Sequence, residues 1–319
     1  MESFIPGRYA AIDIGTVTCR LLVADVDSGG ISSELEHGYK ICNLGEGVDA
    51  SGVLLPSAME RVCSAVAGYQ DLIAEHERVV GKRIPVGCMT TSAARDARNS
   101  QEFVDLLASQ GIRPLVIPGK KEAALSFSGA CSGFQGEPVL VVDIGGGSTE
   151  VVAGVAGEDP VLSHSFNIGC RRVTERFFAQ DPPSSDKVEH ARTWIREQMS
   201  KFFARLEEEG MLPARMIAVA GTATTVVSLH KRMKVYDRDQ VHHANVTAQM
   251  VDQAFTLLSS CSLEERRNLP GLDPGRAPVI VAGMVILQEV MSLARAQSYT
   301  VSESDILQGM ILDAASAGC

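Results

Sequence analysis

The chain has 319 residues, 45% of them hydrophobic and 21% charged, which suits about two globular domains and excludes a disordered or collagen-like protein. Its 29 basic and 39 acidic residues give a net charge of −10. The field of such a molecule repels DNA, RNA and anionic membranes. We therefore expect neither nucleic acid nor membrane as a partner, and a polyanionic ligand requires a local basic patch.

The eight cysteines are scattered, with no C-x-x-C pair and no zinc-like spacing, which indicates unlinked thiols in a reducing compartment. Residues 1–9 lack the pattern of a signal peptide. The longest apolar stretch, 277–287, has only about half of the roughly 20 residues that a membrane span needs. The sequence predicts a cytoplasmic protein.

The first third of the chain alternates strand and helix patterns. Strands are expected at 9–15, 18–27 and 31–41, followed by a long helix from Pro56 whose apolar residues recur every three or four positions. The expected elements that follow are a strand at 84–90, a helix at 99–109, a strand at 112–117 and a helix at 119–131. This alternation predicts an α/β fold with a mixed or parallel sheet.

The same pattern restarts at Pro138. The expected strands are 139–144, 149–153, 161–167 and 216–220, and the expected helices are 172–178, 185–209, 222–230, 277–295 and 304–315. The two halves share Ile12-Asp13-Ile14-Gly15-Thr16 and Val142-Asp143-Ile144-Gly145-Gly146, which lie 130 residues apart. An internal duplication explains this most economically. It predicts an N-terminal lobe at 1–133 and a C-terminal lobe with extra helices at 134–319.

The most informative segment is the octet that runs from Asp143 to Glu150 (DIGGGSTE). Its glycines Gly145, Gly146 and Gly147 allow a tight turn whose amides can point at a phosphate where no Cβ obstructs. Asp143 and Glu150 place carboxylates on either side of this turn, and Ser148 adds a hydroxyl. Carboxylates beside bound phosphate are typical Mg²⁺ ligands. The simpler interpretation is a plain glycine-rich hairpin, which the glycines alone would favour.

The matching turn of the first half contains Asp13, Gly15, Thr16, Thr18 and Arg20. Two hydroxyls, a bare amide and a cation suit a phosphate, although such a hairpin is common in unrelated proteins. A third turn, at Gly221 and Thr222 in the AGTATT segment, joins an expected strand to an expected helix. The amides at the start of that helix would suit another anion.

Two such turns in duplicated lobes resemble the phosphate loops of the actin, heat-shock ATPase and sugar-kinase superfamily. This resemblance implies an α/β fold with two actin-like (ribonuclease H-like) lobes and a cleft between them. A narrower resemblance rests on segments in a fixed order: 11–24, NLGEG at 43–47, TSAARD at 91–96, 117–125, the octet, NIGCRRVTERF at 167–177 and 221–225. Over nearly the whole chain these are similar to the exopolyphosphatase/guanosine pentaphosphatase (Ppx/GppA) family.

The resemblance implies hydrolysis of the terminal phosphoanhydride of polyphosphate or of pppGpp, with Mg²⁺ and a water oriented by a glutamate. Glu122 matches that glutamate, although from its position alone it is a simple helix-start residue. The family's metal and catalytic carboxylates match Asp143 and Glu150, with Asp13 as a further metal ligand. The implied phosphate-binding residues are Gly15, Thr16, Thr18, Arg20, Arg95, Gly145, Gly146, Gly147, Ser148, Arg172, Gly221 and Thr222. Mn²⁺ stays open as an alternative ion, and a homodimer is expected.

A protein with a net charge of −10 needs a local basic patch to bind a polyanion, and five basic residues in the family segments are candidates for it. Each of them alone is more often a solvated surface charge. This set is Arg20, Arg95, Lys120, Lys121 and Arg172. The chain departs from the family at Val17, usually Asn, at Lys121, usually acidic, and at Leu307-Gln308-Gly309, usually Arg-Glu-Gly. It resembles the short form without an appended helical domain, which suggests a preference for short polyphosphates.

The leading hypothesis is an exopolyphosphatase that releases terminal orthophosphate, with polyphosphate or guanosine penta- or tetraphosphate as its partner. The nearest alternative is a pppGpp 5′-phosphohydrolase that uses the same groups. An ATP-dependent kinase on this fold would need an acceptor site and an adenosine clamp. A non-catalytic alarmone sensor or actin-like scaffold would have no use for Glu122 or for the pair Asp143 and Glu150.

Overall fold

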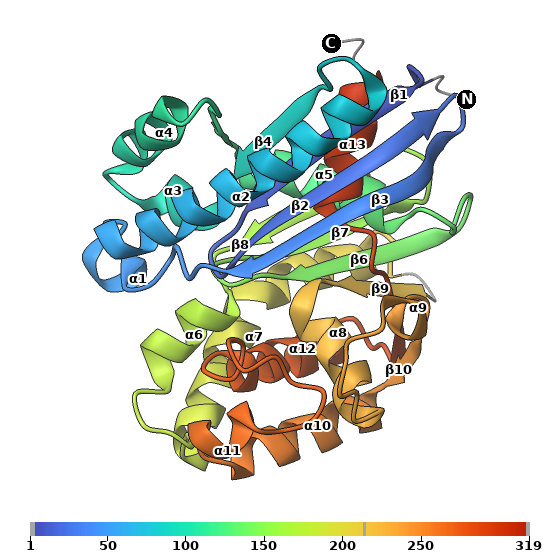
Figure 1. The fold of residues 1–319 in the computed structure, drawn as a ribbon. Helices are drawn as coiled ribbons and strands as arrows, with labels where there is room; N and C mark the ends of the chain where they lie inside the picture. Colours follow the sequence, from blue (N-terminus) through green and yellow to red (C-terminus); the bar gives the residue numbers. More distant parts are fainter. Residues whose placement is uncertain (1–3, 213–214, 317–319) are drawn as a thin grey trace. The chain divides into compact units, whose positions relative to one another are not determined.

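A computed structural model describes residues 4–212 and 215–316 (Figure 1). The chain forms two compact units, each built around its own sheet. The first unit contains residues 4–129 and 305–316, and the second contains the described residues of 130–304. Two α/β units with separate sheets agree with the fold class that the sequence predicts.

The sheet of the first unit has five strands in the order β3-β2-β1-β4-β5. Strands β1 (Gly7–Ile14), β2 (Thr18–Asp27) and β3 (Gly30–Ile41) form an antiparallel meander, and β4 (Val86–Thr90) and β5 (Leu115–Val116) extend it in parallel with β1. Its helices are α1 (Val48–Ser51), α2 (Pro56–Val80), α3 (Ser92–Asp96), α4 (Ser100–Ser109), α5 (Gly119–Ala130) and α13 (Ile306–Ser316).

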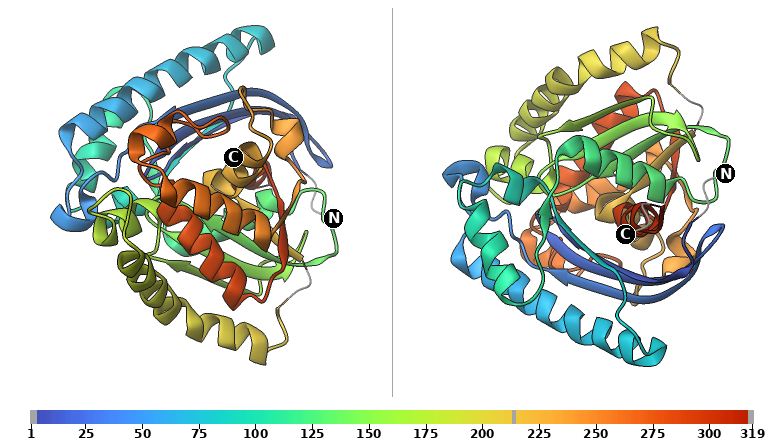
Figure 2. Two further views of the ribbon diagram at one scale, coloured as in Figure 1. Left: turned by 90° about the horizontal axis from the view of Figure 1, so that it is seen from below. Right: turned by 90° about the horizontal axis from the view of Figure 1, so that it is seen from above.

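Both faces of this sheet are covered because successive side chains of a strand point to opposite faces. Along β1, Ile12 packs into a core with Met59 and Val62 of α2, whereas Ala11 packs into another with Met310 and Ile311 of α13. Both views in Figure 2 show α2 and α13 on opposite sides of the sheet. The strand is therefore buried on both faces, and its residues 9–12 form an uninterrupted apolar segment.

The sheet of the second unit has six strands in the order β10-β11-β9-β6-β7-β8. Strands β6 (Pro138–Ile144), β7 (Thr149–Val155) and β8 (Leu162–Phe166) form a meander, β9 (Arg215–Val219) runs parallel to β6, and β11 (Ser298–Val301) and β10 (Asn245–Thr247) complete the sheet. Its helices are α6 (Cys170–Phe177), α7 (Ser185–Glu208), α8 (Ala220–His230), α9 (Arg238–Val241), α10 (Ala248–Ser260), α11 (Leu263–Arg267) and α12 (Ile280–Leu293).

The two units repeat one topology. In each, a three-stranded antiparallel meander is followed by a strand that pairs in parallel with the first strand of the meander. The equivalent strands are β1 and β6, β2 and β7, β3 and β8, and β4 and β9. This repetition supports the duplication inferred from the shared Asp-Ile-Gly segments.

The division of the chain differs from the expected lobes 1–133 and 134–319, because residues 305–316 belong to the first unit. Helix α13 packs on β1 and β2 with Ile306, Met310 and Ile311 buried. Its contact with α5 is close: a Cβ on Gly129 would overlap the carbonyl of Asp305, and one on Gly309 would overlap that of Leu125. The apolar pattern predicts this helix, but not the sheet that it covers.

Other expected elements differ in extent. The strand expected at 112–117 shrinks to β5, and the helix expected at 277–295 begins at Ile280 after a series of turns. Helix α10, of 13 residues, and the short elements α1, α3, α9, α11, β10 and β11 were not expected from the sequence. Within the described ranges, none of the cysteines is in a disulfide, and Cys319 lies outside those ranges.

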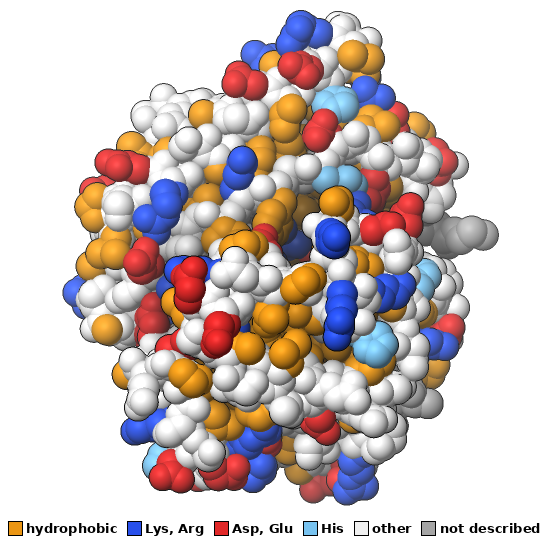
Figure 3. All heavy atoms as spheres, turned by 60° about the horizontal axis from the view of Figure 1, so that its bottom comes forward, with side chains coloured by type: hydrophobic (Ala, Val, Ile, Leu, Met, Phe, Trp, Pro, Cys, Tyr) orange, Lys and Arg blue, Asp and Glu red, His pale blue; other side chains and the backbone are white. Residues whose placement is uncertain are grey.

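No helix in the described ranges is both long and apolar enough to serve as a membrane span. Acidic and basic side chains are interspersed over the face of the molecule shown in Figure 3. The charge imbalance of −10 is therefore not gathered into one broad acidic patch on that face.

Candidate active site

Two hairpin turns, one in each unit, share a backbone geometry. In the first unit the amide of Gly15 donates to the carbonyl of Thr18 at 2.9 Å, and in the second that of Gly145 donates to Ser148 at 3.0 Å. A Cβ added to either glycine would meet that same carbonyl at 3.3 Å. The turns that the sequence analysis paired are therefore structurally equivalent.

The turn of the second unit rests on the start of α6. The amides of Cys170 and Arg171 donate to the carbonyls of Gly145 and Gly146, both at 2.9 Å, and Arg172 Nε donates to the carbonyl of Gly147 at 3.0 Å. These bonds fix the direction in which the carbonyls of the turn point. In the described part of the chain, no bond occupies the amides of Gly146, Gly147 or Ser148.

Successive amides of a turn that have no protein partners can bind an anion, as in phosphate loops. Peptide N–H groups need partners, so a bound anion is the natural complement of such a turn. The turn thus leaves three amides available to a ligand or to water.

Gly169 is required for the contact between α6 and this turn. A Cβ at position 169 would overlap the backbone of Gly146 and the amide of Gly147. We expect Gly169→Ala to destabilise the protein by about 1–3 kcal/mol, the usual cost of overpacking, and to lower phosphate affinity because the turn must shift. Denaturant unfolding and phosphate titration would measure both effects.

Gly68→Ala is the matched control, because a Cβ at position 68 in α2 would meet no atom within 4 Å. It should leave phosphate affinity unchanged and stabilise the helix by up to about 1 kcal/mol. Equal losses of stability in the two variants would contradict the close packing that we assign to Gly169.

Two carboxylates flank the turn of the second unit. Asp143 and Glu150 are direct partners in the β6–β7 ladder, so their side chains lie on the same face of the sheet. Both are buried, at 9% and 2% exposure, and Ser165 Oγ donates to Glu150 Oε1 at 2.7 Å. The structure therefore brings together two acids that lie seven positions apart in the sequence.

The equivalent positions of the first unit carry an acid and a base. Asp13 and Arg20 are direct partners in the β1–β2 ladder, and Arg20 Nη2 lies 2.7 Å from Asp13 Oδ2. Arg20 thus occupies the place that Glu150 has in the second unit. Burial raises the pKa of Asp13, and the charge of Arg20 opposes that shift.

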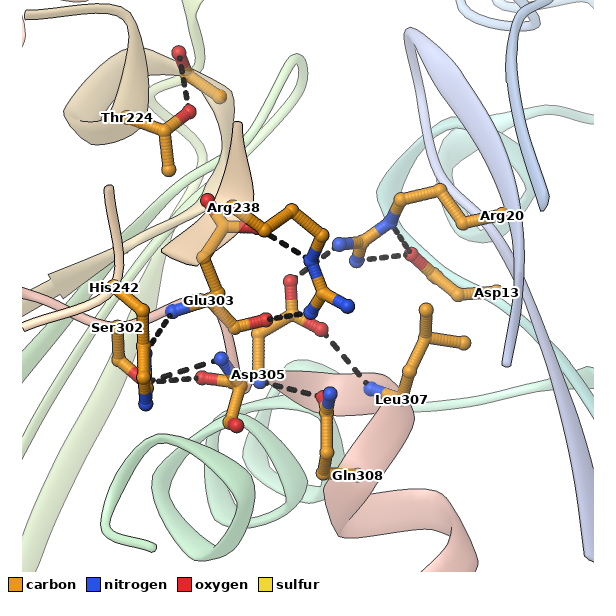
Figure 4. Close-up of polar contacts among 12 residues, drawn as sticks. Asp13, Arg20, Thr224, Arg238, His242, Ser302, Glu303, Asp305, Leu307 and Gln308 are labelled. Atoms are coloured by element: carbon orange, nitrogen blue, oxygen red, sulfur yellow. Dashed lines mark hydrogen bonds and ion pairs between the residues drawn. The ribbon is translucent and has the colours of Figure 1, made fainter. Parts of the chain in front are cut away.

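A second carboxylate holds Arg20 from the other side. Arg20 Nη1 donates to Asp305 Oδ2, so the guanidinium lies between acids from β1 and from the residue before α13 (Figure 4). Burial alone lowers the pKa of Arg20, but Asp305 and Asp13 raise it well above its ordinary value. Asp305 also accepts from the amide of Leu307 at 3.1 Å, so it anchors the start of the helix.

Removing the charge of Asp305 should destabilise the first unit, because Arg20 is largely buried and loses one of its two acidic partners. We expect Asp305→Asn to lower the free energy of unfolding by about 2 kcal/mol, the scale of a hydrogen bond to a charged group. Denaturant unfolding followed by circular dichroism would measure it.

Asp313→Asn on the same helix is the control, since Asp313 pairs with Lys121 in a half-exposed bridge at 2.6 Å. Exposed pairs contribute little, so that variant should change stability by less than about 1 kcal/mol. A loss for Asp305→Asn no larger than for Asp313→Asn would show that the buried bridge adds nothing.

Glu122 lies in the first turn of α5 and is buried, at 7% exposure. Arg95 Nη1 donates to Glu122 Oε2 at 3.0 Å and to the carbonyl of Ile117 at 3.2 Å. Arg95 belongs to α3, which follows β4 directly. The TSAARD segment and the segment around Glu122, which are far apart in the sequence, therefore meet in an ion pair.

The residues of the first unit gather at one edge of its sheet. Since β1 and β4 are parallel neighbours, their carboxyl ends lie side by side, and Thr90 Oγ1 donates to the carbonyl of Ile14 at 3.0 Å. Open α/β sheets bind ligands beyond this edge. The set collected there is Asp13, Gly15, Thr16, Thr18, Arg20, Arg95 and Glu122.

The second unit collects the other expected residues at the equivalent edge, where β6 and β9 are parallel neighbours. Gly221 and Thr222 open α8 directly after β9, and Arg172 bonds the glycine turn after β6. The set of the second unit is Asp143, Gly145, Gly146, Gly147, Ser148, Glu150, Arg172, Gly221 and Thr222.

Two charged residues near these sets, Asp305 and Arg276, were not expected from the sequence. The guanidinium of Arg276 packs on Gly221, where a Cβ would overlap it, and its charge also acts on the buried Cys170 thiol. Arg276 thus lies close to two of the expected anion-binding segments of the second unit. No motif marks either residue, since both are distant in sequence from the turns that they contact.

The basic set expected from the sequence is partly neutralised within the protein. Arg20 is paired with Asp13 and Asp305, Arg95 with Glu122, and Lys121 with Asp313. Lys121 therefore adds less positive potential than its replacement of an acid suggests. Arg172 Nε donates to the carbonyl of Gly147 in the glycine turn.

The acids beside the two turns differ in their arrangement. Within the described ranges, no three Asp, Glu, His or Cys side chains form a cluster that could hold a metal. Asp143 and Glu150 place two carboxylates on one face of the β6–β7 ladder. Asp13 is committed to Arg20 and is a poor ligand in this arrangement.

A model of the Ppx/GppA phosphatase family matches residues 22–317, and the chain belongs to this family. Exopolyphosphatase 2 of Mycobacterium tuberculosis is 37% identical over 97% of this chain and 98% of the relative. The crystal structure of an exopolyphosphatase from Cytophaga hutchinsonii superposes with a TM-score of 0.87 at 25% identity, covering 98% of each chain. The Ppx/GppA family member of Aquifex aeolicus superposes with a TM-score of 0.77 at 27% identity, covering 97% of each chain.

Proposed function

We propose that this protein is an exopolyphosphatase, which hydrolyses the terminal phosphoanhydride of inorganic polyphosphate and releases orthophosphate. The observation that carries the proposal is the glycine turn of the second unit, whose amides at Gly146, Gly147 and Ser148 have no bond within the described chain. Membership of a phosphatase family and 37% identity to an exopolyphosphatase support it.

In this proposal the turn holds the terminal phosphate. The three amides donate to its oxygens, and Arg172 lies beside them through its bond to the carbonyl of Gly147. Gly221 and Thr222, at the start of α8, contact further phosphates with Arg276 alongside. Fixed donors of this kind stabilise the charge that spreads over the phosphoryl oxygens in the transition state.

Glu122 orients the attacking water in this account. A carboxylate within hydrogen-bond reach of water can accept its proton as the oxygen approaches phosphorus. The bond from Arg95 Nη1 to Glu122 Oε2 at 3.0 Å orients the carboxylate. Arg95 is a positioning residue for Glu122 in addition to a candidate phosphate ligand.

Asp143 and Glu150 would hold a divalent cation, for which we propose Mg²⁺. When bound, such an ion neutralises phosphate charge and polarises the phosphoryl oxygens. The register of β6 and β7 supports this proposal because it puts both carboxylates on one face of the sheet, and Ser165 Oγ donates to Glu150.

The test is phosphate release by the purified protein from polyphosphate, pppGpp and ATP, each with Mg²⁺ and with a chelator. We expect release from polyphosphate that requires the ion. Release of phosphate from pppGpp alone would show that the protein is a pppGpp 5′-phosphohydrolase. Release from none of the three substrates would contradict the proposed function.

A further inference from the structure

Ser92 carries a buried hydroxyl without a partner. Its side chain is 1% exposed, and no hydrogen bond to its Oγ exists among the described residues. Buried polar groups are nearly always bonded, and leaving one without a partner costs free energy.

The surroundings of Ser92 belong to the candidate site. It opens α3 directly after β4, where the amide of the preceding Thr91 donates to the carbonyl of Ile14 at 3.3 Å. The next residue, Ala93, packs on Gly45, which also contacts Thr16 and whose amide donates to the carbonyl of Thr16 at 2.9 Å. Ser92 therefore sits at the junction of the first phosphate turn with the NLGEG segment.

The same helix connects Ser92 to Glu122. Residues three apart on a helix are surface neighbours, so Ser92 and Arg95 share one side of α3. Arg95 donates to Glu122 Oε2 at 3.0 Å. The hydroxyl thus lies on the side of α3 from which the helix reaches the candidate catalytic carboxylate.

We propose that Ser92 is a further substrate-binding residue, whose hydroxyl donates a hydrogen bond to a phosphoryl oxygen of the bound substrate. This inference rests on the proposed function. In this proposal the hydroxyl, which has three staggered χ1 positions, turns to a ligand oxygen when substrate binds. The Ser92 hydroxyl, which has no partner among the described residues, then donates its hydrogen bond to the substrate.

The test uses Ser92→Ala and separates stability from binding. Because the hydroxyl has no partner, its removal should leave the melting temperature of the ligand-free protein equal to or above that of the wild type. The value of kcat/KM for polyphosphate should fall at least about tenfold, as for a lost hydrogen bond to a charged ligand. The rise in melting temperature caused by tripolyphosphate should shrink.

Ser228→Ala supplies the stability control. Ser228 is also buried, but its Oγ donates to the carbonyls of Thr225 and Gly271, so its removal should lower the melting temperature. Ser92→Cys repeats the binding test with a weaker donor of similar shape and covers the case in which Ser92→Ala fails to fold.

The proposal is overturned if folded Ser92→Ala or Ser92→Cys keeps kcat/KM within twofold of the wild type and retains the tripolyphosphate shift. A fall in the ligand-free melting temperature of Ser92→Ala as large as that of Ser228→Ala would also contradict it, since the hydroxyl would then have a structural partner. If the wild type releases no phosphate, the proposed function fails, while the tripolyphosphate shift still decides the role of Ser92.

Discussion

Glu122→Gln should lower kcat for phosphate release from polyphosphate by about 10²–10⁴-fold, the usual contribution of a positioned general base. KM should change by less than about threefold, because the amide keeps the shape of the side chain and can still accept the bond from Arg95. Steady-state phosphate release over a range of polyphosphate concentrations would separate the two constants.

The control for this substitution is Glu75→Gln, an exposed residue of α2 whose distance to Arg78 is 3.8 Å. It should leave both constants unchanged. An unchanged kcat for Glu122→Gln would remove Glu122 from the chemistry and assign the Arg95 ion pair a purely structural role.

Asp143→Asn should produce the other large effect. It removes one of the two carboxylates that share a face beside the glycine turn, while the buried volume stays nearly the same. We expect kcat to fall about 10²–10³-fold, which is on the scale of several kcal/mol of lost charge stabilisation by the ion. The Mg²⁺ concentration that gives half the maximal rate should rise, and a Mg²⁺ titration of the rate would show it.

Asp159→Asn, an exposed position after β7 in the same unit, should give the wild-type Mg²⁺ curve. If Asp143→Asn lowered the rate without moving the Mg²⁺ dependence, the carboxylate would act on the substrate and the cation would bind elsewhere. Equal Mg²⁺ dependence of Asp13→Asn and Asp143→Asn would contradict our preference for the second unit as the cation site.

The sequence was sufficient to predict the two turns and the acids beside them. Glycines bracketed by apolar strands can be recognised locally, because a tight turn and a close ligand both require a residue without Cβ. The repeat also predicts equivalent registers, and the structure pairs Asp13 with Arg20 and Asp143 with Glu150 at matching positions. The family segments extended this prediction to Glu122 and Arg95, whose ion pair no local pattern indicates.

The residues that the sequence could not place are those whose contacts span long distances along the chain. Asp305 lies 285 positions from Arg20, yet the two form an ion pair. It could not be predicted because the apolar pattern of α13 does not say which sheet the helix covers. The contact of Arg276 with Gly221 could not be predicted for the same reason, because the two residues are far apart in the sequence.

Ser92 illustrates a different limit. Its segment, TSAARD, was singled out for Arg95, and a serine at a helix start usually has a capping role. Only the absence of any bond to its Oγ among the described residues marks the hydroxyl as available to a ligand. Such a property depends on every neighbouring group and cannot be read from the order of the residues.

The most direct measurement of the central claim is the product distribution from polyphosphate of one defined length, followed over time in Mg²⁺. We predict that wild-type protein releases orthophosphate as chains shorten from their ends, and that Glu122→Gln and Asp143→Asn slow this release at least about 100-fold. Chains cut internally into fragments, or orthophosphate released equally by the wild type and both variants, would contradict it.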